Sequence, residues 1–418
     1  MTGMSEHAER RFLATLLILT FVMNMLARGV TETFAVFLLP VQQGLGVTRA
    51  QITLTYSVYM LAYGLSAPFA GQLIDRFGAR VAYGFGLMSL GCGYVLAGSA
   101  TELWHYLLSA GFLGGLGSAS LGMIAASALL SRWFTNRIGT VMSVPYAAIG
   151  AGMLILPPLT QLMLASTDWR MAHRLLGLGV LVILPLILLA PLKRVTAGSA
   201  EWRELKSKQA TAAVGPWTVG TAVRTGAFWG LIAAYLFTSV AAYSVLPHSV
   251  AYLIEQGFNP LVAASAFGLT GMLSVFGILA IGWLSDRFGR LYTASWSYLS
   301  TIVGIAALML VAIWPSLVLV YAFVWFFGLM QGARGPIIIA SVARLFPGGG
   351  VGTIYGTLSL AMGLGAALGS WISGLLYEVT GSYVSSFALA IVAALLGLAT
   401  FWGVRGLREE RTVVAPVT

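Results

Sequence analysis

The sequence predicts an all-α membrane protein with twelve transmembrane helices arranged in two six-helix bundles. Hydrophobic residues make up 58% of the 418 residues, and charged residues make up only 9%. Water-soluble chains usually contain about 25% charged residues, so most of this surface is expected to face lipid. Long apolar segments also recur along the whole chain, and one charged loop motif occurs twice.

Twelve apolar segments approach or exceed the roughly 20 residues that cross a bilayer. Lipid offers no hydrogen-bond partners to an open backbone, so each segment is expected to be helical. The run that starts near Phe12 is too long for a signal peptide and is expected to be the first span. The spans are placed near 12–38, 49–73, 82–99, 103–131, 139–164, 172–190, 226–256, 260–283, 292–312, 316–345, 351–378 and 383–404.

The loop Gly71-Gln-Leu-Ile-Asp-Arg-Phe-Gly-Ala-Arg80 returns half a chain later as Gly282-Trp-Leu-Ser-Asp-Arg-Phe-Gly-Arg290. Each copy joins the second and third spans of its half. Internal repetition of this kind is typical of secondary transporters. We therefore expect an N-terminal bundle at 1–190, a cytoplasmic linker at 191–225 and a C-terminal bundle at 226–418.

The basic residues predict the orientation of the chain. With the N-terminus inside, eighteen of the 23 Lys and Arg residues fall in inside loops and tails. Only Arg49, Arg170 and Arg174 fall outside, and Arg28 and Arg334 lie within spans. Cytoplasmic loops of membrane proteins carry such an excess, so both termini and the linker are expected in the cytoplasm. This one-sided distribution argues against a nucleic-acid partner, despite the net charge of +10.

The repeated loop fits the pattern G-x-x-x-D-R-x-G-x-R, which is the signature of the major facilitator superfamily. The first copy matches at Gly71, Asp75, Arg76, Gly78 and Arg80, and the second copy matches at Gly282, Asp286, Arg287 and Gly289. The chain resembles this superfamily over nearly its whole length. In the superfamily this loop ties helices together when the cytoplasmic gate is closed, so the resemblance implies a gating role for Asp75, Arg76, Arg80, Asp286 and Arg287. The alternative is that these charges only set the topology.

Shorter motifs resemble the bacterial branch close to monocarboxylate transporters and oxalate/formate antiporters. That branch usually has an acidic residue before the glycine of span 1, whereas this chain has Arg28-Gly29, followed by Glu32. The motifs are Ser131-Arg-Trp-Phe134, Arg224-Thr-Gly-Ala-Phe-Trp229, His248 with Val250-Ala-Tyr-Leu253, and Gly352-Thr-Ile-Tyr-Gly356.

A polar stripe marks span 1. Asn24, Arg28 and Glu32 recur every four residues and so share one face of a helix. Ionisable groups at the bilayer centre cost about 2.5–3.5 kcal/mol on insertion scales, so this face is expected to line the transport pathway. Glu32 is the one acidic residue well inside a predicted span, which makes it the candidate for proton coupling. The alternative is a local Arg28–Glu32 ion pair that only holds helices together.

Span 10 contains a second intramembrane cation, Arg334, between Gly332 and Gly335 and close to Gln331. A guanidinium offers two parallel donors that match a carboxylate, so Arg334 and Gln331 are candidates for substrate binding. The resemblance supports this interpretation, because spans 1, 4, 7 and 10 line the cavity in the superfamily. The alternative is a structural arginine bonded to carbonyl groups near Pro336.

Two further side chains are weaker candidates. His248, just after Pro247 in span 7, could carry a proton or bind substrate, and the alternative is a packing histidine. Tyr59 lies on a stripe with Tyr56 and Tyr63, where aromatic packing is the favoured interpretation and substrate contact the other.

The intramembrane charges predict the class of substrate. The predicted spans contain two cations, Arg28 and Arg334, and one well-buried carboxylate, Glu32. The net charge of these three groups is positive, so an anionic substrate is expected to balance it. We interpret the chain as a secondary transporter of a small organic anion, in particular a monocarboxylate, driven by proton symport or by exchange with a counter-anion. The alternatives are a proton-coupled drug or metabolite efflux carrier and a non-transporting membrane sensor.

Other function classes find no support in the residue pattern. No nucleophile, base and orienting group occur together, no phosphate-binding loop is present, and Cys92 is the single cysteine. We therefore expect neither an enzyme nor a cofactor or metal site. The chain is expected to be a monomer that crosses the inner (plasma) membrane many times.

The orientation can be tested by chemical labelling. Single cysteines at Ser5, Ser207 and Thr412, introduced into a Cys92→Ser variant, should resist an impermeant thiol reagent in intact cells and react after permeabilisation. Strong labelling of any of them in intact cells would contradict the twelve-span arrangement.

Overall fold

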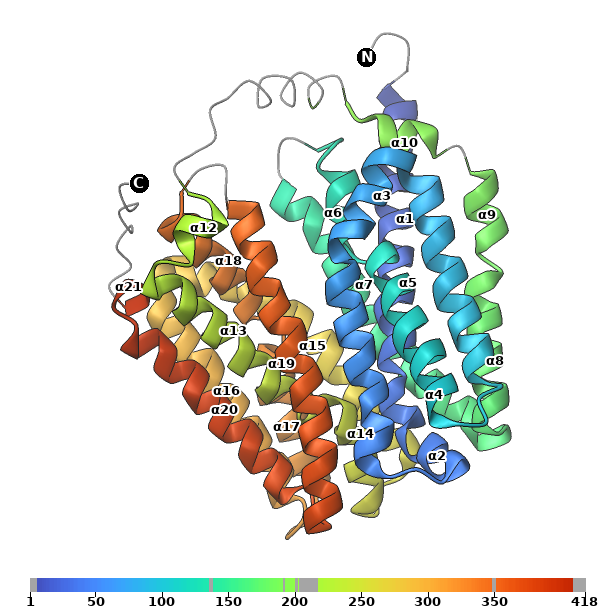
Figure 1. Ribbon diagram of the computed structural model, residues 1–418, viewed down its shortest axis with the longest axis vertical. Helices are drawn as coiled ribbons and strands as arrows, with labels where there is room; N and C mark the ends of the chain where they lie inside the picture. The colour runs from blue at the N-terminus through green and yellow to red at the C-terminus, as the bar shows by residue number, and fades with distance from the viewer. Residues whose placement is uncertain are drawn as a thin grey trace. The chain divides into compact units, whose positions relative to one another are not determined.

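The computed structural model describes residues 6–134, 138–190, 192–199, 202, 217–347 and 351–408, and these ranges are built from helices (Figure 1). Among these residues, ten helices are long and apolar enough to cross a membrane. The predicted all-helical membrane fold is thus confirmed. The chain divides into two compact units, one formed by Met1–Leu45 with Leu61–Ala212 and the other by Gly46–Met60 with Ala213–Thr418.

The first unit contains the helices of the first half of the chain. They are α1 (Glu6–Glu32), α2 (Phe34–Leu45), most of α3 (Arg49–Ala97), α4 (Leu103–Tyr106), the π-helix η1 (Leu107–Leu113), α5 (Gly114–Leu121), α6 (Met123–Leu130), α7 (Ile138–Ser166), α8 (Trp169–Leu181), α9 (Leu184–Leu189) and α10 (Lys193–Ala197).

The second unit contains the start of α3 and the helices of the second half. These are α12 (Val219–Ala222), α13 (Gly226–Tyr243), α14 (Leu246–Glu255), α15 (Pro260–Phe288), α16 (Arg290–Leu310), α17 (Leu317–Met330), α18 (Arg334–Leu345), α19 (Val351–Thr380), α20 (Val384–Gly403) and α21 (Arg405–Arg408). Most of the linker predicted at 191–225 lies outside the described residues.

The repeated loops turn at equivalent glycines. α3 contains two predicted spans that meet at Gly78, whose φ is 83°. Gly289, at the same place in the second copy, separates α15 from α16 with a φ of 82°. Residues other than glycine rarely adopt this left-handed backbone conformation. The turn therefore explains why the motif has glycine at both positions.

Glycines also let helices approach closely. In the first unit α1 packs along α7, and a Cβ added to Gly29 would lie 2.8 Å from the Cα of Gly152. In the second unit α13 packs along α19, where a Cβ on Gly365 would lie 2.5 Å from the carbonyl oxygen of Leu236. Small residues at such crossings allow van der Waals packing, which drives helix association in lipid.

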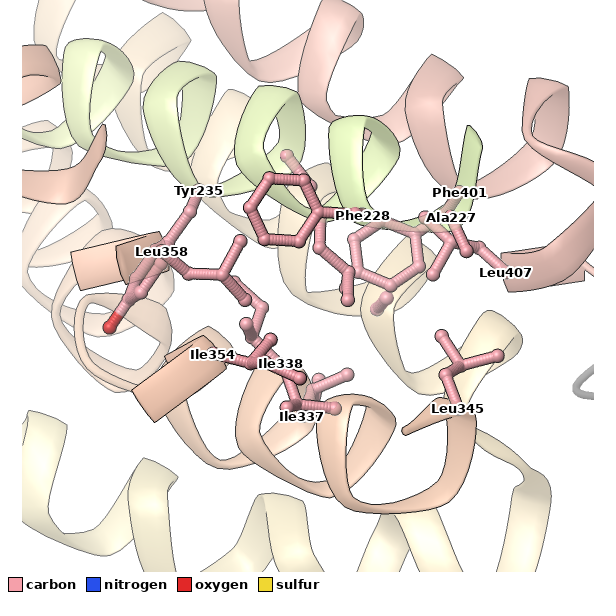
Figure 2. Packing of buried hydrophobic residues seen from close by; sticks show 14 of the residues in the cluster. Ala227, Phe228, Tyr235, Ile337, Ile338, Leu345, Ile354, Leu358, Phe401 and Leu407 are labelled. Atoms are coloured by element: carbon pink, nitrogen blue, oxygen red, sulfur yellow. The ribbon is translucent and has the colours of Figure 1, made fainter. Parts of the chain in front are cut away.

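Large apolar side chains fill the core of the second unit (Figure 2). Phe228 and Tyr235 extend from α13, and Leu358 from α19 meets them together with Ile337 and Ile338 of α18. This packing holds α18, which carries Arg334, in a fixed place within the second unit.

Several predicted spans are interrupted along their length. The breaks lie at Thr33 between α1 and α2, at Gly122 between α5 and α6, at 244–245 between α13 and α14, and at 331–333 between α17 and α18. A further break separates α8 from α9. Broken helices within a membrane are tolerated where they line a cavity or are buried in protein, and they often form transporter binding sites.

Candidate functional site

The polar stripe of span 1 lies at the end of α1. Glu32 is the last residue of α1, and its side chain is 1% exposed and lies 2.6 Å from the Arg28 guanidinium. The local ion pair considered from the sequence is therefore present. Asn24 is also buried, and its amide donates a hydrogen bond to the carbonyl oxygen of Thr20 at 2.8 Å.

Arg334 begins α18, directly after the break in span 10. It is 1% exposed. One terminal nitrogen donates to the carbonyl oxygen of Ser297 at 3.2 Å and to the Thr301 hydroxyl at 3.0 Å. The guanidinium also lies over the Tyr298 ring, 4.6 Å from its centre.

The described partners of Arg334 are all neutral. Among the residues that the structure describes, no carboxylate forms an ion pair with Arg334, and its Nε has no hydrogen-bond partner. The nearby Gln331 has a buried Oε1 that is likewise without a hydrogen-bond partner in the described part of the chain. A buried cation without a counter-charge is unfavourable unless a ligand supplies one.

His248 and Tyr59 occupy packed surroundings. His248 is fully buried, with Nδ1 3.1 Å from the Tyr383 hydroxyl and Nε2 3.0 Å from the carbonyl oxygen of Ser370. Tyr59 is 3% exposed, and its ring centre lies 5.4 Å from that of Tyr56. These contacts match the packing interpretation of both side chains.

The gating candidates of the first loop contact residues within the first unit. Asp75 forms an ion pair with Arg132, which follows α6 and also donates to the carbonyl oxygen of Thr196 at 2.7 Å. Arg80 donates to the carbonyl oxygen of Ala190 at 2.6 Å, whereas Arg76 is exposed. The loop is thus fastened to the segment around α10.

The second loop is described only in part. Arg287 is exposed and lies over the Trp283 ring at 5.4 Å. The side chain of Asp286 lies outside the described residues.

Sequence reasoning did not select two of these contact residues. Tyr298, beneath Arg334, carries no charge or motif that marks it. Arg132 does stand in the Ser131-Arg-Trp-Phe134 motif, and that motif was the available signal.

The described residues contain no group of three or more His, Cys, Asp or Glu side chains that could hold a metal ion.

Arg132 should matter more to stability than its partner Asp75. The Asp75 side chain is 63% exposed, so Asp75→Asn should cost no more than about 1 kcal/mol, as for other surface ion pairs. Arg132 is 5% exposed and also bonds Thr196, so Arg132→Gln should lower the melting temperature clearly more. Thermal unfolding of the two purified variants checks this, and equal shifts would contradict the contacts described.

With this geometry established, comparisons with known proteins show what the chain is similar to. It is 28% identical over 381 residues to "Monocarboxylate transporter 13" of Rattus norvegicus, covering 90% of this chain and 85% of the relative. It is 22% identical to the "Uncharacterized MFS-type transporter YcxA" of Bacillus subtilis (strain 168), covering 90% of this chain and 91% of that protein.

Solved structures share the fold. The inward-open structure of the xylose transporter XylE from E. coli matches with a TM-score of 0.74 and 13% identity, covering 94% of this chain and 96% of that one. A structure of the nucleoside transporter NupG matches with a TM-score of 0.76 and 11% identity, covering 93% of this chain and 100% of that one.

The sequence pattern described as "Major Facilitator Superfamily" matches residues 17–329, which is most of the chain. This agrees with the resemblance inferred from the repeated loops, and it identifies a transporter rather than an enzyme. The chain belongs to the major facilitator superfamily.

Proposed function

We propose that this transporter carries a small organic anion, in particular a monocarboxylate, by proton symport or anion exchange with alternating access. The observation that carries the proposal is the buried guanidinium of Arg334, whose described partners are all neutral. An anionic substrate would supply the missing counter-charge. A cationic drug or a neutral sugar would not.

The geometry of Arg334 supports a carboxylate in particular. Its Nε is buried and has no hydrogen-bond partner among the described residues, and one terminal nitrogen already bonds Ser297 and Thr301. A guanidinium held in this way keeps donor capacity for a planar acceptor. Gln331, whose Oε1 is also unbonded within the described ranges, is the neighbour proposed to contact the rest of the substrate.

The named relatives favour the same class of substrate. Several are called monocarboxylate transporters, at 24–28% identity. At this distance the relatives support a substrate class and no particular compound.

Glu32 is proposed as the coupling residue. It is buried and paired with Arg28. A substrate anion that competes for Arg28 would disturb this ion pair, and binding of proton and anion would then be linked.

We also propose an organisation for the chain, in which the repeated loop indicates the two bundles and the basic residues indicate their orientation. Bundles at 1–190 and 226–418 flank a cytoplasmic linker at 191–225, with both termini in the cytoplasm and the protein a monomer in the plasma membrane. The repeated loops, with Asp75, Arg76, Arg80, Asp286 and Arg287, are proposed to act at the cytoplasmic gate.

Arg334→Lys should impair transport although it keeps the charge, because the planar pair of donors is lost. Uptake of a radiolabelled carboxylate panel into proteoliposomes should fall at least about tenfold, which corresponds to about 1.4 kcal/mol. Arg334→Ala should be at least as impaired. Arg174→Lys is the matched control, because Arg174 is partly exposed and bonds the Ser99 hydroxyl in the first unit. Wild-type uptake by both Arg334 variants would remove Arg334 from the site.

Glu32→Gln should separate binding from coupling, because it mimics the protonated carboxyl. Accumulation driven by a pH gradient should be lost, while passive exchange of substrate is partly kept. Glu102→Gln is the control, because Glu102 is exposed at a helix start. If Glu32→Gln still concentrates substrate under an imposed pH gradient, the coupling group lies elsewhere.

A further inference from the structure

Three residues of α16 surround the Arg334 guanidinium. Ser297, Tyr298 and Thr301 belong to this helix, and each of them is at most 1% exposed. The Ser297 carbonyl oxygen and the Thr301 hydroxyl both accept from Nη1 of Arg334, and the Tyr298 ring lies against the guanidinium. The Thr301 hydroxyl donates its own proton to the Ser297 carbonyl oxygen at 3.0 Å, so its lone pairs remain for Arg334.

Tyr298 is in turn held by two other helices. Its hydroxyl lies 2.6 Å from the Thr238 hydroxyl and donates to the carbonyl oxygen of Ala234 at 3.3 Å, and both residues are on α13. The ring lies closely against Gly397 of α20, where an added Cβ would lie 2.7 Å from a ring carbon. Because the hydroxyl end and the edge of the ring are both fixed, the ring is held beneath Arg334.

These contacts leave one edge of the guanidinium for a ligand. Both hydrogen bonds that the structure describes for Arg334 use Nη1, whose two protons match the two acceptors. Nε has no hydrogen-bond partner among the described residues. In a planar guanidinium, the Nε proton and one proton of the other terminal nitrogen, Nη2, point in the same direction. Two parallel donors of this kind match a carboxylate.

The Tyr298 ring also limits the shape of the anion that this edge can accept. A carboxylate that binds both donors lies in the plane of the guanidinium, together with the carbon that carries it. A tetrahedral anion that binds both donors places a third oxygen on one side of this plane and its carbon on the other. The ring covers one face of Arg334, so it disfavours the tetrahedral anion.

We propose that Tyr298 and Thr238 are positioning residues that present the Nε–Nη2 edge of Arg334 to the substrate and so select planar carboxylates over tetrahedral anions. The inference rests on the proposed function, which assigns Arg334 to substrate binding. An arginine over a buried aromatic face is attracted by the ring, most strongly where water is excluded. A guanidinium that is already held in place also loses less conformational freedom when the substrate binds.

Competition between two anions of equal charge tests the positioning role. Uptake of the best-transported carboxylate of the panel into proteoliposomes is inhibited by the same carboxylate, or by the sulfonate with the same carbon substituent. The ratio of the two inhibition constants measures the preference. Tyr298→Leu removes the flat ring and its cation–π contact, so the preference for the carboxylate should fall about tenfold or more. Tyr298→Phe keeps the ring and should lose only about threefold, as for one hydrogen bond.

Thr238→Val tests the anchor of the ring. Valine has nearly the shape of threonine but lacks the hydroxyl, so the preference should fall about threefold. Tyr298→Phe removes the same hydrogen bond from its other end, and the double variant should therefore lose no more than Tyr298→Phe alone. Thr238→Val also keeps the proposal testable if Tyr298→Leu does not fold.

Tyr252→Phe is the matched control. Tyr252 is 2% exposed, belongs to the same unit, and donates from its hydroxyl to the carbonyl oxygen of Leu308 at 2.9 Å. Its substitution removes a buried tyrosine hydrogen bond away from the described contacts of Arg334. It should leave the preference between the two anions unchanged, whatever its effect on the melting temperature.

Arg334→Gln, measured in parallel, separates this inference from the proposed function. It should weaken inhibition by both anions. If it does so while Tyr298→Leu and Thr238→Val keep the wild-type ratio, the positioning role is overturned and the proposed function stands. If Arg334→Gln leaves inhibition by both anions unchanged, or if the wild-type protein takes up no carboxylate of the panel, both are overturned. A lower maximal uptake with an unchanged ratio in the Tyr298 variants would assign Tyr298 to the fold alone.

Discussion

The membrane interior can hydrate neither a backbone group nor a charge, and this constraint shapes the whole protein. Backbone groups are satisfied within helices, which is why the described residues are built from helices. Charges are few, and a cation that is removed from water requires an arrangement of its own. The partly buried Arg28 and the buried Arg49 and Arg334 differ in the groups that surround the guanidinium.

Arg28 is paired within its own helix, since Glu32 lies one turn further along α1. Arg49 is paired across a tertiary contact, because Glu255 is distant in sequence and water reaches it. Arg334 has only neutral described partners. The three cations thus differ in their surroundings: a carboxylate on the same helix, a carboxylate at a tertiary contact, and neutral groups alone among the described residues.

The fold could be predicted from the sequence because its determinants are local. Hydropathy over about 20 residues identifies a span, and each predicted span coincides with one or more observed helices. The repeated motif also located the turns at Gly78 and Gly289, where a positive φ is required.

The site could be predicted only in part, because its contacts depend on packing. The burial of Arg334 follows from its span, but the ring of Tyr298 beneath it depends on how α16 meets α18. The sequence placed Arg49 in an outer loop. Its partner Glu255 lies 206 positions away, so no local pattern connects the two residues. The contacts of His248 with Tyr383 and Ser370 likewise join residues more than a hundred positions apart. No local pattern could have shown these pairings.

The central claim is that Arg334 recognises the negative charge of the substrate. It is tested most directly by competition between a transported carboxylate and its neutral amide of the same shape in proteoliposomes. The wild-type protein should prefer the carboxylate strongly, and Arg334→Gln should lose that preference while other members of the site stay intact. Equal recognition of the neutral amide by the wild-type protein would contradict the account.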